Sequence, residues 1–426
     1  MADAGTYERL CALLGTRGEA ILARDPVNQP MIRHWCDAME DDNPVYTDPA
    51  IAARSVFGEV VAPATMLNTW SMLGLTRRPA GSTGDDPQSR ALRVLDAAGF
   101  TSVVATNCDH EYDRPLVLGD HLSSTIELVE VSPEKKTALG VGHFVTTQTE
   151  YRDLRGERVG AMRFRILKFA PGTGRVAPGG AGGASAAAPT RRLAPSIPDG
   201  ASGRATLVRV LDAAGAAASA FGPERVAAEI ELAEGGRVEA DVVDLARELV
   251  VPGVALELAI DESDPDSPVP VFRIARAPRR ASTRGFDAIE VGERLAPCPI
   301  PITTTRIVAT AIASRDYQDV HHDPVLARRR GSPDIFMNIL TSGGLCGRYV
   351  SDWAGPEARF LAMHIRLGAP NYPGDCMTMY GEVAAKERRG GRGIATIALR
   401  GANRLGDHVT GTIELALPDA EGPALG

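Results

Sequence analysis

The spacing of apolar residues changes along the chain and predicts a repeated order of helices and strands. Apolar side chains recur every three or four positions at Ile32, Trp35, Cys36 and Met39, which is typical of a helix with one buried face. The spacing of Val308, Ala311 and Ile312 predicts a second helix of the same kind. We therefore expect two equivalent units, each of which begins with an amphipathic helix.

In both units a longer apolar segment follows, and then runs of alternating polarity. Apolar residues dominate 60–75 and 335–353, which predicts a long central helix in each unit. Runs such as MTMYGEVAAKE (377–387) and GIATIALRGAN (393–403) predict long strands. Helices packed against antiparallel strands belong to the α+β class, which is the fold class that we expect.

Composition divides the chain into four regions. Of the 34 residues in 170–203, 25 are Ala, Gly, Pro or Ser, which predicts a flexible linker after a first domain at 1–169. Short β-like runs separated by Gly or Pro predict a small barrel at 204–276. The last domain is expected at 285–418.

Three short motifs occur twice in the same order, which indicates that the first and last domains are homologous. DDNPVYTDP (41–49) aligns without gaps on DYQDVHHDP (316–324). The pattern P-x3-G-D occurs at 115–120 and again at 370–375, and GERV (156–159) corresponds to GDHV (406–409). We therefore predict that two related domains flank the barrel.

Charge and cysteine usage exclude several classes of function. The net charge is −8, and the region 204–276 alone carries 14 acidic and 7 basic residues, which argues against nucleic-acid binding. No apolar run reaches the ~18 residues of a membrane span, and no signal peptide is visible, so we expect a cytoplasmic protein without membrane contact. The six cysteines lack a C-x2-C spacing, and no G-x-G-x-x-G stands in the right context, so neither a metal nor a redox cofactor is expected.

The second copy of the first motif contains the residues with the clearest chemistry. Asp316 and His321 are separated by four residues on a loop that follows a predicted helix. A carboxylate and an imidazole that converge on one point can hold and polarise a water molecule. Addition of water to a conjugated double bond requires this kind of pair, so both residues are predicted to be catalytic.

These motifs resemble the MaoC-like hydratase/dehydratase family of hot-dog enzymes. The shared features are D-x4-H with a trailing H-D-P, an apolar helix, P-x3-G-D and G-x-x-V. The resemblance implies a double hot dog, in which an acyl-CoA thioester lies between two units and Asp316 and His321 bind the catalytic water. It also implies that a backbone N–H near Phe336, Met337 or Asn338 holds the thioester carbonyl, where the family usually has His-Gly.

One branch of the family resembles the chain more closely. IFMNILTSGGLCGRYVSDWAGP with RDYQDVHHD is similar to the catalytic subunit of bacterial steroid side-chain enoyl-CoA hydratases. VAPATMLNTW after DDNPVYTDP is similar to their non-catalytic subunit, and 204–276 resembles the OB-fold domain of that subunit without its zinc ribbon. The resemblance implies a hydro-lyase that hydrates a bulky enoyl-CoA, whose OB domain docks a thiolase-like aldolase. The sequence leaves two other functions open: a dehydratase for carrier-protein thioesters in polyketide or lipid synthesis, and a scaffold for an aldolase. It also leaves open whether the protein is a homodimer.

The two copies differ where catalysis would occur. Tyr46 stands in place of His321, and a phenol with a pKa near 10 cannot replace imidazole as a proton shuttle. Pro63, which has no N–H, stands where a thioester-binding amide would lie. We therefore expect a silent first domain whose apolar residues Met66, Trp70 and Leu73 either line an acyl pocket or belong to the core.

For other polar residues in the last domain the sequence leaves two interpretations open. Arg328, Arg329 and Arg330 either bind CoA phosphates or form a solvated helix end. Thr341 and Ser342 either contact the thioester or allow close helix packing. His322 is interpreted as a supporting or solvent-facing residue, and His408, on a predicted strand, as a structural residue.

Overall fold

The computed structural model describes residues 4–75, 85–174, 195, 197–198, 200–211, 225–243, 251–261 and 269–425. Most of the predicted linker at 170–203 lies outside these residues. Within the described ranges, no helix combines the length and the apolar character that a bilayer crossing requires.

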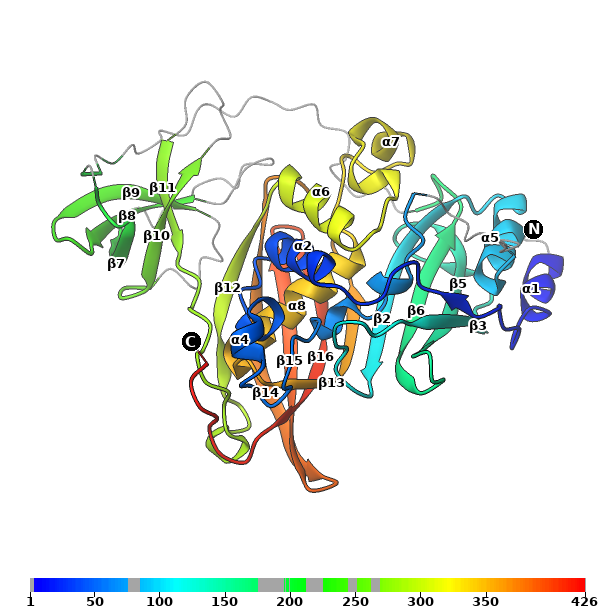
Figure 1. Cartoon of the computed structure of the whole chain (residues 1–426). Coiled ribbons are helices and arrows are strands. Elements are labelled where there is room, and N and C mark those ends of the chain that lie inside the picture. Colours follow the sequence, from blue (N-terminus) through cyan, green and yellow to red (C-terminus); the bar gives the residue numbers. More distant parts are fainter. Residues whose placement is uncertain are drawn as a thin grey trace.

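One antiparallel sheet of eleven strands passes through both of the homologous domains (Figure 1). Its order is β1-β3-β5-β6-β2-β13-β16-β15-β14-β12, with β4 beside β5. The first domain contributes β1 (Ile21–Leu22), β2 (Ser102–Tyr112), β3 (Ser123–Val131), β4 (Lys135–Lys136), β5 (Val141–Arg152) and β6 (Arg158–Phe169). The last domain contributes β12 (Arg294–Ile302), β13 (Arg359–Leu367), β14 (Asp375–Arg389), β15 (Arg392–Asn403) and β16 (Gly406–Leu417).

The helices pack around this sheet, with α8 against its central strands and α1 and α5 at the far end of the first domain (Figure 1). The α-helices are α1 (Ala4–Cys11), α2 (Gln29–Met39), α3 (Pro44–Thr47), α4 (Pro49–Ala52), α5 (Pro87–Ala97), α6 (Thr304–Ala313), α7 (Pro324–Arg329) and α8 (Ile339–Ala354). Short 3₁₀ helices are η1 (Ala64–Met66), η2 (Thr69–Ser71), η4 (Phe286–Ala288) and η5 (Asp319–His321). The α+β class is therefore confirmed, and the two sheet-and-helix units lie side by side as in a double hot dog.

The two amphipathic helices form as local rules predict, with one change of face. The Asn28 side chain caps α2 by accepting from the Met31 N–H, and the apolar residues that defined the predicted face of α2 are all buried. In α6 the buried residues are Ile307, Thr310 and Ala311, while Ile312 is exposed. The buried face of α6 therefore differs from the predicted one: it includes Thr310 and leaves out Ile312. Thr310 can be buried because its hydroxyl donates a hydrogen bond to the Arg306 carbonyl.

Glycines on α8 allow both domains to approach this helix closely. A Cβ at Gly344 would lie 2.8 Å from atoms of Trp35 and Met39, and a Cβ at Gly347 would lie 2.7 Å from Thr65. Side chains at these positions would separate α8 from the first domain. One continuous core consequently includes residues of both domains, whereas the barrel has a core of its own.

The long helix predicted at 60–75 is absent from the first domain. The segment instead forms η1 and η2, and Met72 is extended. Thr65, Asn68 and Thr69 favour caps and turns over helix interiors, and this segment packs across Gly347 of α8 rather than forming a second central helix. Only the last domain therefore has the long central helix that was expected in both.

Backbone geometry repeats at the three duplicated motifs. Gly119 and Gly374 of P-x3-G-D have φ values of 90° and 87°, and Gly156 and Gly406 have 83° and 122°. Asp48 and Asp323 both cap the short helix that follows by accepting two backbone N–H groups. The residues directly before Asp41 and Asp316, Glu40 and Arg315, are the two non-glycine residues with positive φ in the described part of the chain.

A closed barrel stands apart from the sheet (Figure 1). Its strands are β7 (Arg204–Val210), β8 (Arg225–Leu232), β9 (Arg237–Val243), β10 (Ala255–Asp261) and β11 (Val269–Ile274), in the order β10-β11-β9-β8-β7. Pairing is antiparallel except between β11 and β9. The small all-β module expected between the two domains is therefore present.

Candidate active site

Asp316 and His321 meet in a buried position beside the start of α8. Asp316 is 8% exposed and His321 is 4% exposed. The His321 Nε2 atom lies 3.5 Å from Asp316 Oδ2, which is longer than a direct hydrogen bond. α6 ends at Ala313 with Ser314 as its C-cap, and the turn of η5 brings His321 back towards the aspartate.

The hydrogen bond on the other ring nitrogen fixes the tautomer of His321. Nδ1 lies 2.7 Å from the Phe336 carbonyl oxygen, which can only accept, so Nδ1 carries the proton. In the neutral ring Nε2 is then an acceptor. This nitrogen and a carboxylate oxygen of Asp316 are thus two acceptors that face each other, and a molecule with two O–H donors can bridge them.

The Asn338 side chain orients Asp316. Its Nδ2 donates to Asp316 Oδ2 over 3.1 Å and to Ser314 Oγ over 3.0 Å, while its Oδ1 accepts from the Thr341 N–H and caps α8. The N–H of Gln318 donates to Asp316 Oδ1 over 3.3 Å. The same residue therefore starts the central helix and holds the carboxylate in place.

Two of the three backbone amides predicted for the thioester carbonyl already have protein partners. The Phe336 N–H donates to the Val320 carbonyl over 3.2 Å, and the Met337 N–H donates to the Asn371 carbonyl over 3.1 Å. Among the described residues, none accepts from the Asn338 N–H. The Phe336 and Met337 amides are thus occupied in this structure, and binding of the thioester carbonyl by one of the three amides stays a prediction.

The corresponding position in the first domain has different electrostatics. Tyr46 is buried there, and this burial, followed by the nearby Asp41 carboxylate, raises the pKa of its phenol. Asp41 itself accepts a hydrogen bond from Arg279 Nη2 over 2.5 Å and is ion-paired to it. The aspartate of the first domain is thus neutralised by an arginine, whereas the contacts of the Asp316 carboxylate with described residues are N–H donors and His321.

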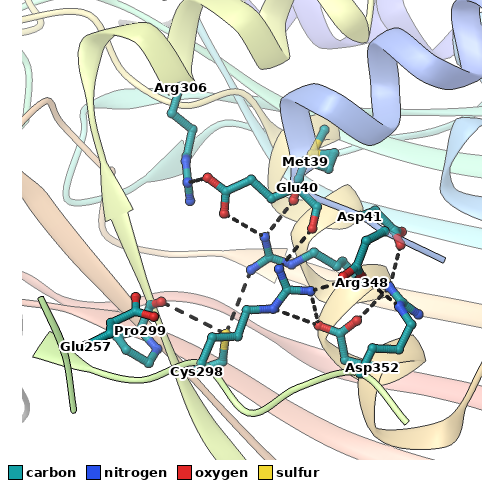
Figure 2. A network of polar contacts seen from close by, with 12 residues as sticks. Met39, Glu40, Asp41, Glu257, Cys298, Pro299, Arg306, Arg348 and Asp352 are labelled. Atoms are coloured by element: carbon teal, nitrogen blue, oxygen red, sulfur yellow. Dashed lines mark hydrogen bonds and ion pairs between the residues drawn. The ribbon is translucent and has the colours of Figure 1, made fainter. Parts of the chain in front are cut away.

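Arg279 belongs to a buried network of arginines and carboxylates where the two domains meet (Figure 2). Arg348, on α8, donates to the Met39 carbonyl over 2.6 Å, and its Nη1 lies 3.4 Å from Glu40 Oε2. Glu40 is also paired with Arg306. Arg276 and Arg279, directly after the barrel, pair with Asp352 over 2.6 Å each.

Asp352 is a buried carboxylate of this network that pairs with two arginines. Burial raises its pKa, although the neighbouring guanidinium groups of Arg279, Arg276 and Arg348 act in the opposite direction. The network therefore links the chain that leaves the barrel, the end of α2 and the far end of α8.

Comparisons with known proteins identify the family of this chain. Residues 14–162 match the family model of the FAS1-like dehydratase domain region. The beta subunit of 3-oxo-4,17-pregnadiene-20-carboxyl-CoA hydratase from Mycobacterium tuberculosis is 52% identical over 116 residues, which are 27% of this chain and 87% of that subunit. The chain belongs to the MaoC-like hydratase/dehydratase family.

Two further comparisons concern the other subunit and the fold. The alpha subunit of the same Mycobacterium tuberculosis enzyme is 44% identical over 151 residues, 35% of this chain and 47% of that subunit. The chain spans about half the length of the first curated relatives that it matches, 52% and 47%. A solved MaoC-like dehydratase shares the fold, with a TM-score of 0.58 at 17% identity over 96% of this chain and 99% of that one.

Within this MaoC-like chain, the three arginines after the catalytic loop differ in their contacts. Arg330 is paired with Asp319 over 2.6 Å, and Arg328 donates to the Pro333 carbonyl over 3.1 Å. Arg329 is exposed at the end of α7. Binding of CoA phosphates by these residues stays a prediction.

The residues predicted for an acyl pocket are mostly internal. Met66 and Trp70 are 0% and 2% exposed, and Leu73 is half-buried. The pocket beside Tyr46 is lined by Leu67, together with Tyr112 and Phe360, rather than by these three residues. Their position therefore agrees with the second interpretation, ordinary core residues.

The sequence did not show which residues His408, interpreted there as structural, would contact. His408 Nε2 lies 2.7 Å from Ser342 Oγ, its Nδ1 donates to the Ala369 carbonyl, and burial lowers its pKa to about 4. A neutral His408 thus supports the first turn of α8 from behind. The orienting role of the Asn338 side chain was also missed, although an Asn directly before an apolar helix is a recognisable cap signal.

Proposed function

We propose that this chain is a 2-enoyl-CoA hydratase, a hydro-lyase that adds water across the 2,3 double bond of an acyl-CoA. The observation that carries the proposal is the pair of facing acceptors, Asp316 Oδ2 and His321 Nε2, 3.5 Å apart beside the start of α8. A water molecule bridging them would donate one hydrogen bond to each. Its oxygen would then present a lone pair to the substrate.

The proposed reaction balances without another reactant. As the water oxygen bonds to C3, one of its protons passes to the Asp316–His321 pair, and the pair returns a proton to C2. Negative charge that develops on the thioester oxygen would be stabilised by the Asn338 N–H and the positive end of α8. In this scheme the substrate carries coenzyme A, and the acid–base steps involve neither a redox cofactor nor a metal.

A bulky, polycyclic acyl group is the substrate class that we propose. The matched relatives from Mycobacterium tuberculosis are named for a steroid acyl-CoA. In this chain the first domain has η1 and η2 in place of a central helix, and residues 102–107 of β2 are only half-buried. Both features are expected to leave room for a large acyl group beside the last domain.

A panel of enoyl-CoA substrates tests this proposal. Crotonyl-CoA and steroid-sized enoyl-CoA thioesters would be compared by the loss of enoyl absorbance. We expect hydration of both, with a larger kcat/KM for the bulky substrate because apolar burial contributes about 25 cal/mol per Å². Failure to hydrate any member would contradict the proposed activity, and a clear preference for crotonyl-CoA would contradict the proposed acyl group.

Dehydration of carrier-protein thioesters is a second candidate. The family model that matches residues 14–162 is named for a dehydratase region, and hydration and dehydration are the two directions of one reaction. Activity with 3-hydroxyacyl thioesters of a carrier protein, but not with the CoA thioesters, would favour this candidate.

We further propose that the barrel docks a protein, with a thiolase-like aldolase as the expected partner. The region 204–276 carries 14 acidic and 7 basic residues, and the barrel stands apart from the rest of the chain (Figure 1). A tethered module raises the effective concentration of its partner near the active site.

Removal of the barrel should separate docking from hydration. Deletion of 204–274 leaves Arg276 and Arg279 in place, and these residues must stay because both pair with Asp352. We expect hydration of crotonyl-CoA within about threefold of the full chain, because the polar contacts of Asp316 and His321 with described residues do not involve the barrel, and loss of co-purification with the partner. A folded deletion variant that has lost hydration would place the barrel in the active site instead.

A further inference from the structure

Two residues at equivalent positions adopt a backbone conformation that normally favours glycine. Glu40 has φ 54° and Arg315 has φ 58°, and each directly precedes the aspartate of its domain. Both close a helix, since the Glu40 N–H donates to Asp37 and the Arg315 N–H to Ile312. A glycine would do this without the steric cost of a Cβ, so a side chain at either position requires another reason.

For Glu40 the reason is visible in the protein. Its carboxylate pairs with Arg306 and with the buried Arg348, and these two guanidinium groups lower its pKa against the opposing effect of burial. The strained backbone thus places a charge inside the network where the two domains meet (Figure 2).

Arg315 has no such partner in the described part of the chain. It is half-buried, and no carboxylate or carbonyl of a described residue accepts from its guanidinium. The guanidinium lies against the first domain, because a Cβ at Gly74 would be 3.3 Å from Arg315 Nη2. Residues 76–84, which follow Gly74, contain neither Asp nor Glu.

Among the described residues, a cation without a partner carboxylate therefore lies against the first domain, one residue before Asp316. We propose that Arg315 is a specificity-determining residue that binds the phosphate of the substrate's phosphopantetheine arm. The inference rests on the proposed function, because thioesters of this class carry their negative charge on phosphate. Arginine is suited to the role, since its planar fork donates two parallel hydrogen bonds to phosphate oxygens. The phosphate is common to CoA and to carrier-protein thioesters.

Kinetics with truncated substrates test the assignment. Arg315→Gln would be compared with the wild type on crotonyl-CoA, crotonyl-4′-phosphopantetheine and crotonyl-pantetheine, which lacks the phosphate. We expect kcat/KM to fall about ten- to hundredfold on the first two substrates, through KM, because a hydrogen bond to a charged group is lost. Crotonyl-pantetheine should be hydrated equally by both proteins. Arg54→Gln, at an exposed arginine of the first domain, serves as the charge control and should leave all three rates unchanged.

The outcomes separate this inference from the proposed function. An equal loss on crotonyl-pantetheine, no loss on crotonyl-CoA, or a loss confined to crotonyl-CoA would overturn the assignment to the arm phosphate. If the wild type hydrated none of the substrates, the proposed function would fail. The role of Arg315 would then still be tested by measuring the binding of 4′-phosphopantetheine by calorimetry. About tenfold weaker binding to Arg315→Gln than to the wild type would support the assignment, and equal binding would overturn it.

A second variant guards against misfolding. Arg315→Gly relieves the positive φ, so we expect a Tm no lower than that of the wild type together with the same rise in KM. A lower Tm with an unchanged KM would show that the side chain only stabilises the fold.

Discussion

Replacement of Asp316 by Asn, or of His321 by Ala, is expected to lower kcat on enoyl-CoA by at least about 10²-fold, the lower end of the usual contribution of a general acid or base. His321→Ala removes one of the two groups that face each other across 3.5 Å, and Asp316→Asn replaces the carboxylate by an amide that cannot take a proton, so the bridging water would no longer be activated. The check is steady-state kinetics on protein whose unfolding transition matches that of the wild type.

His322→Ala is the matched control for this prediction. His322 is adjacent to His321 but exposed, and it lies outside the pair. We expect its kcat to stay within about threefold of the wild type, well below the contribution of an acid–base group. A loss of less than about threefold in both Asp316→Asn and His321→Ala would refute the catalytic assignment.

Replacement of Arg279 by Ala is expected to lower the free energy of unfolding by about 3–5 kcal/mol at neutral pH, as is typical when one partner of a buried ion pair is removed. The Arg279, Asp41 and Asp352 side chains are 7%, 5% and 11% exposed. Without the guanidinium, two buried carboxylates would face each other with only Arg276 and Arg348 nearby. Urea unfolding measures the loss.

This defect should depend on pH. Burial already raises the pKa of Asp352 in the folded state, and loss of Arg279 would raise it further. A carboxyl whose pKa is raised by folding binds its proton more tightly in the folded state. Its contribution to the free energy of unfolding is therefore largest below the pKa of the unfolded state, and it declines as the pH rises through the pKa of the folded state. The difference between Arg279→Ala and the wild type should therefore be smaller at about pH 5 than at about pH 8.

Arg280 provides a control one residue away. It pairs with Glu421 at the surface, where the two side chains are 40% and 52% exposed. Its replacement by Ala should cost less than about 1 kcal/mol, as is usual for an exposed pair. An equal loss of unfolding free energy in Arg279→Ala and Arg280→Ala would contradict the proposed importance of the network. Adding Asp352→Asn to Arg279→Ala should recover part of the lost stability, because it removes one of the two buried carboxylates.

Local pattern and internal repetition predicted the parts of the fold that depend on neighbouring residues. The amphipathic face of α2, the strands of the last domain and the duplicated turns at Gly119 and Gly374 follow from spacing and from the need for positive φ. The D-x4-H spacing likewise allowed Asp316 and His321 to meet, because the turn of η5 lies within that short segment.

Features that depend on distant contacts were not predictable in this way. The amides of Phe336 and Met337 are occupied by Val320 and Asn371, and no local pattern shows such a pairing. Likewise, Arg279 in the basic segment after the barrel is buried against Asp41, 238 positions earlier, and no local pattern shows this contact. The apolar run at 60–75 fits a helix as well as it fits the observed turns, and its packing against α8 decides between them.

The pairing of β2 with β13 has a consequence for how the protein is made. These central strands are joined by five register pairs, from Asn107–Arg366 to Glu111–Ala362, and the barrel and the catalytic loop lie between them in the sequence. During synthesis the first domain leaves the ribosome long before its partner strand exists, so one edge of β2 stays open. Such distant pairing forms slowly. We therefore expect the first domain expressed alone to self-associate through this edge, and the intact chain to need its C-terminal half before it becomes soluble.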